Sequence, residues 1–176
     1  MEVSRSRGFT LVEQLVVLLV ASILLTVGVP SFARMFARAR VQAAGSELAV
    51  SLALARMRAV TEQSSWSLCP STDGVGCTGA SDWTRGWIVF ADPNELGRPS
   101  ASDIAERVRP DDDGPEITGT AGRRLLSFRA DGTSAGSNAT LLLCAREHGV
   151  GRRIIVSNAG RTRTEALRDG DPACAG

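Results

Sequence analysis

The stretch that most constrains this chain is residues 9–29, twenty-one residues that are apolar apart from Glu13, Gln14 and a few small side chains. As an α-helix, a segment of this length rises about 30 Å, which matches the thickness of the hydrocarbon core of a bilayer. We therefore expect a membrane-spanning helix. Glu13 is the unusual residue in it, because a carboxylate in such a helix costs about 2–3 kcal/mol, and less near an end. This cost predicts a partner for Glu13.

The remainder of the chain is large enough for one modest globular domain. The full sequence has 176 residues, of which 43% are hydrophobic and 22% charged, with a net charge of +1. Without the first thirty residues or so, a single domain is left. Only 5% of the residues are aromatic and none is Tyr, so the core is expected to be mainly aliphatic.

The near-zero net charge conceals an asymmetry. Residues 92–116 hold eight acids against three arginines, a local charge of −5, and residues 121–168 hold nine arginines against three acids, a local charge of +6. The basic part predicts a polar partner, and an ordinary solvated surface is the alternative. Residues 92–116 also carry four prolines, and we expect them to form a long exposed insertion with one helical turn near Ile104.

Four cysteines all lie beyond the apolar stretch. In an exported domain an even number predicts two disulfides, with three possible connectivities. We favour Cys69–Cys77, which would close a short Gly-rich loop, and Cys144–Cys174, which would pin the C-terminal tail. A zinc site is the competing interpretation, but it needs paired short spacings such as C-x-x-C, and the sequence has none.

The orientation in the membrane follows from the cysteines rather than from charge. Residues 1–8 resemble the charged start of a signal peptide, but no small-residue cleavage site follows the apolar run. Arginines flank both ends of that run, so charge leaves the topology open. Disulfides favour a cytoplasmic N-terminus with the C-terminal domain outside.

The helical pattern continues past Pro30 to about residue 63, as an amphipathic half spanning residues 30–63. At about 1.5 Å per residue the whole helix would be roughly 80 Å long, and Pro30 predicts a kink in it. Apolar residues at three–four spacing make one stripe along this half: Phe32, Phe36, Ala39, Ala43, Val50, Leu54 and Met57. Val41, Leu48 and Leu52 make a thinner stripe on the opposite side. One stripe should pack on the protein's own domain, and the other indicates a second partner or burial in a thick core.

Residues 64–176 change to short β-like runs separated by Gly, Pro and Asp. The runs are residues 66–69, 86–91, 124–128, 140–145 and 153–157. The expected fold is therefore α+β, with a long kinked N-terminal helix packed on an antiparallel β-sheet domain.

Residues 8–13, Gly-Phe-Thr-Leu-Val-Glu, resemble the leader junction of type IV pilins and pseudopilins. The resemblance implies that residues 1–8 are a leader peptide, cut after Gly8 by prepilin peptidase, and that the new Phe9 amine is N-methylated. Residues 9–29 would then be a filament-core helix held in the bacterial inner membrane before assembly. The Phe9 amine of one subunit would neutralise Glu13 of its neighbour, because an unpaired charge there costs several kcal/mol. A plain membrane anchor is the alternative.

Three segments of the domain extend the resemblance across nearly the whole chain. Residues 86–92, 126–132 and 155–163, in this order, resemble the FimT/FimU and GspH-type minor pilins. The likeness implies major and minor pilins as partners, a single membrane span with the domain in the periplasm, and a later position in a pilus at the cell surface.

The sequence Gly160-Arg161-Thr162-Arg163 resembles the C-terminal GRxR motif of FimT-like minor pilins, which is associated with DNA binding during uptake. Gly160 permits a tight turn, and i, i+2 spacing places both guanidinium groups on one side of an extended segment. Arginine offers planar, multi-donor recognition of phosphate. Further arginines that would widen the patch are Arg152, Arg153 and Arg168, with Arg123 and Arg124. We expect weak, non-specific binding of double-stranded DNA, with a log–log salt slope of about −2 to −3.

Enzyme functions fit poorly. His148 is the single histidine, there is no G-x-S-x-G sequence, and without lysine there is no Walker A loop. The acidic run at residues 111–113 lacks the alternate spacing of a calcium loop. We expect no catalytic residue, no metal and no cofactor.

The sequence thus predicts a minor pilin near the tip of a type IV pilus, which binds extracellular DNA through arginines for natural transformation. A structural pilus-initiation subunit without DNA binding is the first alternative. A GspH-type minor pseudopilin of a type II secretion system is the second.

Overall fold

The structure is a computed structural model that describes residues 10–110, 113–134 and 138–174. The chain forms two compact units, which divide between Phe36 and Ala37. The predicted processing site at Gly8 and Phe9 lies outside the described residues, as do Asp111 and Asp112 of the acidic run.

The first unit contains the N-terminal part of helix α1, whose full bounds are Leu11–Glu62. Thr10 precedes the helix, and its Oγ1 accepts a hydrogen bond of 3.3 Å from Glu13 N, as an N-cap residue does. By length and composition, the helix is long and apolar enough to cross a membrane. Pro30 lies inside the helix, which continues on both sides of it, and the kink stays a prediction.

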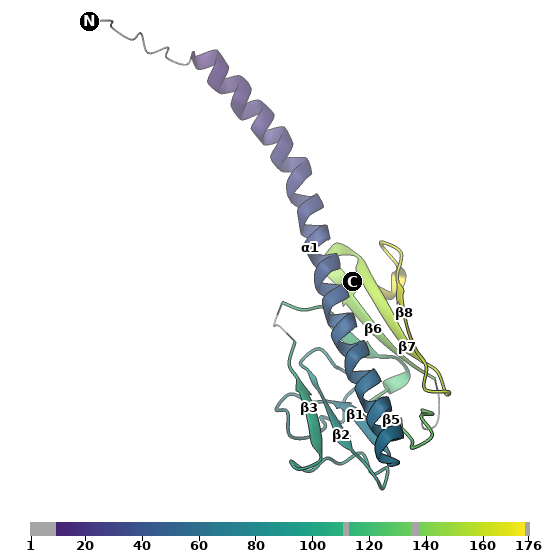
Figure 1. The fold of residues 1–176 in the computed structure, drawn as a ribbon. Helices are drawn as coiled ribbons and strands as arrows, with labels where there is room; N and C mark the ends of the chain where they lie inside the picture. The colour runs from purple at the N-terminus through teal and green to yellow at the C-terminus, as the bar shows by residue number, and fades with distance from the viewer. Residues whose placement is uncertain (1–9, 111–112, 135–137, 175–176) are drawn as a thin grey trace, which may run out of the picture. The chain divides into compact units, whose positions relative to one another are not determined.

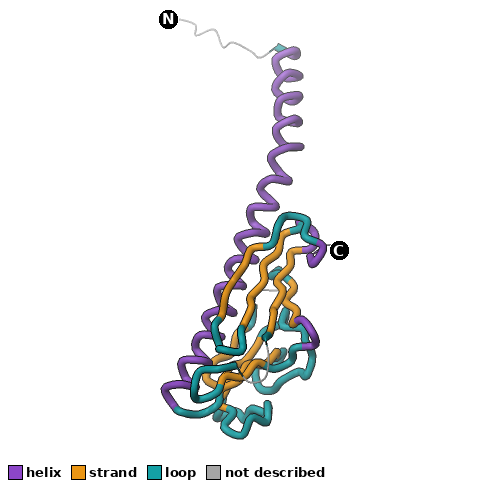
Figure 2. The backbone as a smooth tube through the Cα atoms, turned by 90° about the vertical axis from the view of Figure 1, so that its right-hand side faces the viewer, coloured by secondary structure: helices purple, strands orange, loops and turns teal. Residues whose placement is uncertain are grey.

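The second unit holds the remainder of α1 and two antiparallel four-stranded sheets, in the orders β3-β2-β1-β5 and β4-β6-β7-β8 (Figure 1). The first sheet consists of β1 (Trp66–Pro70), β2 (Trp87–Ala91), β3 (Ile104–Val108) and β5 (Leu126–Phe128). The second consists of β4 (Glu116–Gly119), β6 (Ala139–Ala145), β7 (Val150–Val156) and β8 (Thr162–Ala166). Figure 2 shows these strands beside the later turns of the helix. The expected helix-on-antiparallel-sheet architecture is confirmed.

The expectation of an exposed insertion over residues 92–116 was wrong in part, because Asp92 at its start is only 4% exposed and Glu116 at its end begins β4. A helical turn near Ile104 was predicted, but Ile104–Val108 forms strand β3 and pairs with β2. Its side chains alternate between half-buried and exposed, so the charged residues Glu106 and Arg107 are compatible with an edge strand. Arg107 Nε donates a 2.8 Å hydrogen bond to Gly74 O, which ties this edge to the loop between β1 and β2.

The thinner of the two stripes on α1 is the one that packs on the sheets. Val41, Leu48 and Leu52 are buried, together with Ala44, Ala55 and Ala59, in the main core with Trp83 and Trp87. On the wider stripe, by contrast, Val50 is 63% exposed and Met57 is 54% exposed. Alanines line the buried face because small side chains let the strands approach the helix closely.

Both favoured disulfides are present. Cys69–Cys77 joins β1 to the following loop, with Cα atoms 5.5 Å apart, and covers a small second core of Cys69, Ile88 and Phe90. Cys144–Cys174 joins β6 to the C-terminal 3₁₀ turn η3 (Pro172–Cys174), with Cα atoms 5.3 Å apart. The second bridge therefore pins the tail to the sheet, as expected.

Candidate nucleic-acid interface

Strands β7 and β8 form a hairpin whose turn leads into the predicted arginine motif, residues 160–163. Ser157 N donates to Arg161 O (3.0 Å) and Gly160 N donates to Ser157 O (2.8 Å), so residues 158–160 make a three-residue loop. In such loops the third residue adopts a left-handed conformation, and Gly160 has φ +70°. The turn predicted from the sequence is therefore present, and it requires glycine at this position.

The alternation of side chains places Arg161 and Arg163 on one face of β8. Arg163 pairs with Ile155 and Thr162 pairs with the buried Val156, so the odd-numbered side chains of β8 face away from the core. Arg161 lies at the end of the turn with the same parity, and both arginines are exposed. The Arg161 side chain makes no hydrogen bond or ion pair with any residue that the structure describes.

Glu165 lies on the same face, which the sequence analysis overlooked. Its Oε2 accepts a 2.8 Å hydrogen bond from Arg153 Nε, and its Oε1 is 3.2 Å from Arg163 Nε. These contacts place Arg153 near Arg163, with an acid between the two guanidinium groups. The spacing of Glu165 two residues after Arg163 was the available signal, since alternate residues of a strand share a face. We call Arg153, Arg161, Arg163 and Glu165 the hairpin cluster.

Two of the other predicted arginines lie elsewhere. Arg152 lies two residues before the buried Ile154 on β7, so its side chain is on the face that packs against α1. Its Cδ would lie 3.1 Å from a Cβ added to Gly45 of that helix. Arg168 follows the far end of β8, which at about 3.3 Å per residue separates it from the turn by about 16 Å. It is next to Asp169, which forms an ion pair with Arg38 of α1. The structure therefore does not bring Arg152 or Arg168 to the hairpin cluster.

Arg123 lies closer to the turn. Its Nη2 donates a 3.2 Å hydrogen bond to Asn138 O, and the Asn138 side chain accepts a hydrogen bond from Asn158 N. Arg124 follows it in the link to β5 and is exposed. Arg123 is thus held at the same end of the sheet as the turn.

The loop between β5 and β6 packs against the turn. Ser134 N donates a 2.9 Å hydrogen bond to Asn158 O, and Asp131 Oδ1 accepts hydrogen bonds from Thr133 Oγ1 and Thr133 N. The bond from the Thr133 side chain is the largest cause of an Asp131 pKa below the usual aspartate range. Asp131 is therefore ionised in neutral solution and stabilises its own loop.

The hairpin cluster can bind an anion but shows no metal-binding arrangement. Among the described residues, no group of three or more His, Cys, Asp or Glu side chains is placed to hold a metal ion. Exposed guanidinium groups on an edge strand suit phosphate groups instead.

Comparison with known families identifies the chain. The family model described as "Type II transport protein GspH" matches residues 44–160, which include both sheets up to the Gly160 turn. The chain belongs to the GspH family. A second model, the prokaryotic N-terminal methylation motif, matches residues 3–29. No curated protein matches the chain.

Solved structures agree with this GspH-family assignment. The type IV minor pilin FimU of Pseudomonas aeruginosa strain PAO1 is 26% identical, with a TM-score of 0.52, over 73% of this chain and 98% of that one. The minor pseudopilin EpsH of the Vibrio cholerae Type 2 Secretion System is 14% identical, with a TM-score of 0.53, over 72% of this chain and 97% of that one. The EpsH likeness shows the fold alone.

The GspH family sets the class of function. The chain is a minor pilin or pseudopilin of a type IV pilus or a type II secretion system, and such proteins are structural subunits rather than enzymes. The family implies assembly with other pilins and processing by prepilin peptidase. The apolar helix with its methylation motif indicates membrane anchoring before assembly.

Proposed function

We propose that this GspH-family protein is a minor pilin near the tip of a type IV pilus, and that it binds double-stranded DNA non-specifically for natural transformation. The observation that carries the proposal is the placement of Arg161 and Arg163 on one exposed face at the end of a hairpin. DNA phosphates are the expected ligands, because sequence-independent binding rests on backbone contacts.

The hairpin cluster sets the expected strength of binding. Arg161 offers its whole guanidinium group, whereas Arg153 and Arg163 are shared with Glu165. Two or three phosphate contacts per subunit give a salt slope of about −2 to −3. Binding of this kind is weak for one subunit and is strengthened when several subunits contact the same duplex.

Assembly rests on the helix. After cleavage at Gly8, the Phe9 amine would pair with Glu13 of a neighbouring pilin in the filament core. The exposed wider stripe, with Val50 and Met57, supports contact of α1 with other subunits.

Two observations bear on the location of the protein and the machine to which it belongs. The disulfides favour a periplasmic position of the second unit before assembly. The likeness to the type IV minor pilin FimU, at 26% identity, supports a pilus.

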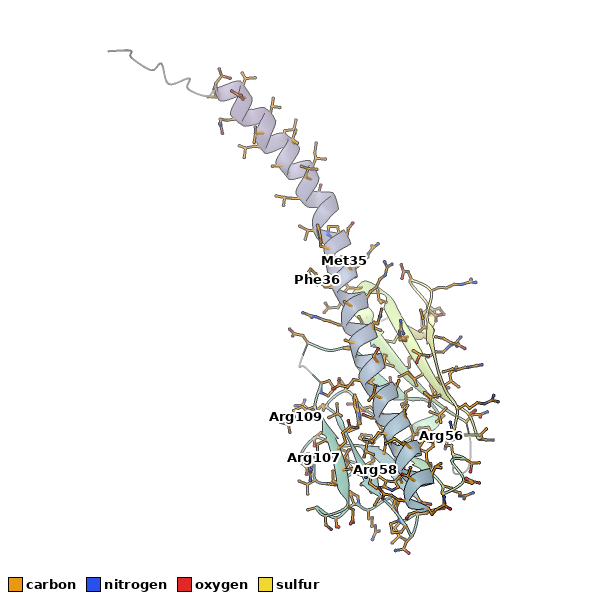
Figure 3. The ribbon with its side chains drawn as sticks, in the orientation of Figure 1. Met35, Phe36, Arg56, Arg58, Arg107 and Arg109 are labelled. Carbon is orange, nitrogen blue, oxygen red and sulfur yellow. A yellow bond between two sulfur atoms is a disulfide. The ribbon has the colours of Figure 1, made fainter. Side chains whose placement is uncertain are left out.

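A DNA-retardation assay on the full chain in a neutral detergent tests the binding. Arg161→Gln with Arg163→Gln should abolish retardation of a short labelled duplex. The matched control is Arg107→Gln with Arg109→Gln, a second i, i+2 pair of exposed arginines, at the end of β3 in the other sheet (Figure 3). Both double variants remove two positive charges, so equal losses would indicate a net-charge effect and contradict the proposal. Unchanged retardation by the first variant would also contradict it.

A further inference from the structure

Arg56 connects α1 to two turns at once. Its Nε donates a 3.0 Å hydrogen bond to Gly132 O in the β5–β6 loop, and its Nη2 donates a 3.4 Å hydrogen bond to Ala159 O in the β7–β8 turn. The side chain projects from α1 on the side of β7 and β8, as Figure 3 shows. A planar guanidinium can serve two carbonyl acceptors together, which an ammonium group does less well.

The two turns are packed against each other where Arg56 meets them. Gly132 and Gly160 both have left-handed conformations, with φ +77° and +70°. A Cβ added to Gly160 would collide with Gly132 O, and one added to Gly132 would lie 3.0 Å from Val60 Cγ2 of α1. Any movement of the β7–β8 turn is therefore coupled to the neighbouring loop and to the helix.

We propose that Arg56 is a positioning residue that holds the β7–β8 turn in the conformation that presents Arg161 and Arg163 to DNA, an inference that rests on the proposed function. Ala159 precedes Arg161 by two residues, so the carbonyl that Arg56 holds lies within the turn that presents Arg161. A turn that is already ordered loses less conformational freedom on binding, and it therefore binds more tightly. Arg56 is half-buried and its Nε and Nη2 are engaged with carbonyls, which argues against a direct phosphate contact.

The test compares Arg56→Gln with Arg58→Gln in the full chain in neutral detergent. Arg58 lies on the same helix, forms an ion pair with Glu62, and has its Cζ 5.7 Å from the centre of the Trp66 ring, away from both turns. Each variant removes one positive charge and one set of helix-surface contacts. We expect DNA affinity to fall about three- to tenfold in Arg56→Gln and less than about twofold in Arg58→Gln. Arg56→Lys should lose only part of the DNA affinity, because lysine keeps the positive charge but lacks the planar guanidinium that donates to two carbonyls.

Two further readouts separate positioning from other roles. The amides of Ser134 and Gly160 donate to Asn158 O and Ser157 O, so their hydrogen exchange should accelerate in Arg56→Gln and not in Arg58→Gln. The salt slope of DNA binding should be the same in both variants. Unchanged exchange in Arg56→Gln would overturn the inference, as would faster exchange with wild-type affinity. A slope reduced by about one in Arg56→Gln alone would show a direct phosphate contact instead.

The same measurements distinguish this inference from the proposed function. The proposed function fails if the wild-type chain does not retard DNA, or if the Arg161→Gln, Arg163→Gln variant retards it as strongly as the wild type does. The positioning role for DNA then fails with it. If DNA binding depends on Arg161 and Arg163 but not on Arg56, only the positioning role is overturned.

Discussion

Glu165 Oε1 lies 3.2 Å from Nε of Arg163, so an acid shares the face of β8 that we propose for DNA. The other carboxylate oxygen of Glu165 accepts a hydrogen bond from Arg153. Exposed ion pairs of this kind are worth about 0–1 kcal/mol, so a phosphate group can replace the carboxylate at little cost. If these arginines bind DNA as we propose, the acid both holds the two guanidinium groups in place and competes with phosphate for them.

Replacing this acid should tighten DNA binding. In Glu165→Gln, Arg153 and Arg163 are released for phosphate contacts, and we expect about three- to tenfold higher affinity from the loss of two weak competing pairs. The salt slope should become steeper by about one. Fluorescence anisotropy with a labelled duplex over a series of salt concentrations measures both quantities.

Glu62→Gln is the control for net charge. It removes one acid that pairs with Arg58 on α1, so it changes the total charge equally without touching the hairpin cluster. An equal gain of affinity in both variants would show that charge alone is responsible. A loss of affinity in Glu165→Gln would show that the acid orders the arginines more than it competes with DNA.

The Gly160 turn should be intolerant of any side chain. Alanine in a left-handed conformation costs about 1–2 kcal/mol, and the added Cβ would also collide with Gly132 O. We expect Gly160→Ala to lower the free energy of unfolding by about 2–4 kcal/mol. Gly79→Ala is the matched control, because Gly79 has φ +72° and a Cβ there would meet no atom within 4 Å. Denaturant unfolding monitored by tryptophan fluorescence measures both, and equal losses would exclude the predicted collision.

The elements that could be predicted from sequence are those whose signal is local. Strands such as β1 and β2 are apolar runs next to Gly or Pro, and the sequence analysis placed them within one or two residues. Strands β3, β4 and β8 were not predicted, because each lies at a sheet edge and carries at least one charged residue. The buried stripe of α1 could not be chosen in advance, because its alanines contribute little hydrophobicity and its fit depends on sheets that are distant in sequence.

In the candidate site, too, the features with a local sequence signal could be predicted and those made by distant residues could not. The Gly160 turn and the common face of Arg161 and Arg163 depend on neighbouring residues and were predicted. Arg152 and Arg153 were both assigned to the patch, yet adjacent residues of a strand face opposite sides. Arg56 reaches carbonyls 76 and 103 residues away, and no local pattern indicates such contacts.

Stability should fall in acid partly through Glu95. A hydrogen bond from Arg129 and a second one from Ser65 hold the pKa of Glu95 below the usual value of 4.5. A lowered folded-state pKa gives stability that is fully present above the unfolded value and is lost as the pH falls through the folded value. The denaturant midpoint should therefore be lower at about pH 4 or below than at neutral pH. This decrease should be larger in the wild type than in Glu95→Gln. The same acid dependence in both proteins would assign the loss to other carboxylates.

Glu13 should matter for assembly and not for membrane insertion. If Glu13 pairs with the Phe9 amine of a neighbouring pilin, then Glu13→Val leaves that amine unpaired where water is scarce, at a cost of several kcal/mol. The variant should fractionate with the membrane normally, because valine is more compatible with lipid than glutamate, but it should be missing from sheared pilus fractions. Gln14→Val is the control, since it removes the adjacent polar side chain without removing a charge. Normal recovery of Glu13→Val from sheared pili would contradict the pairing, and equal exclusion of both variants would show that any apolar change at this end of the helix blocks assembly.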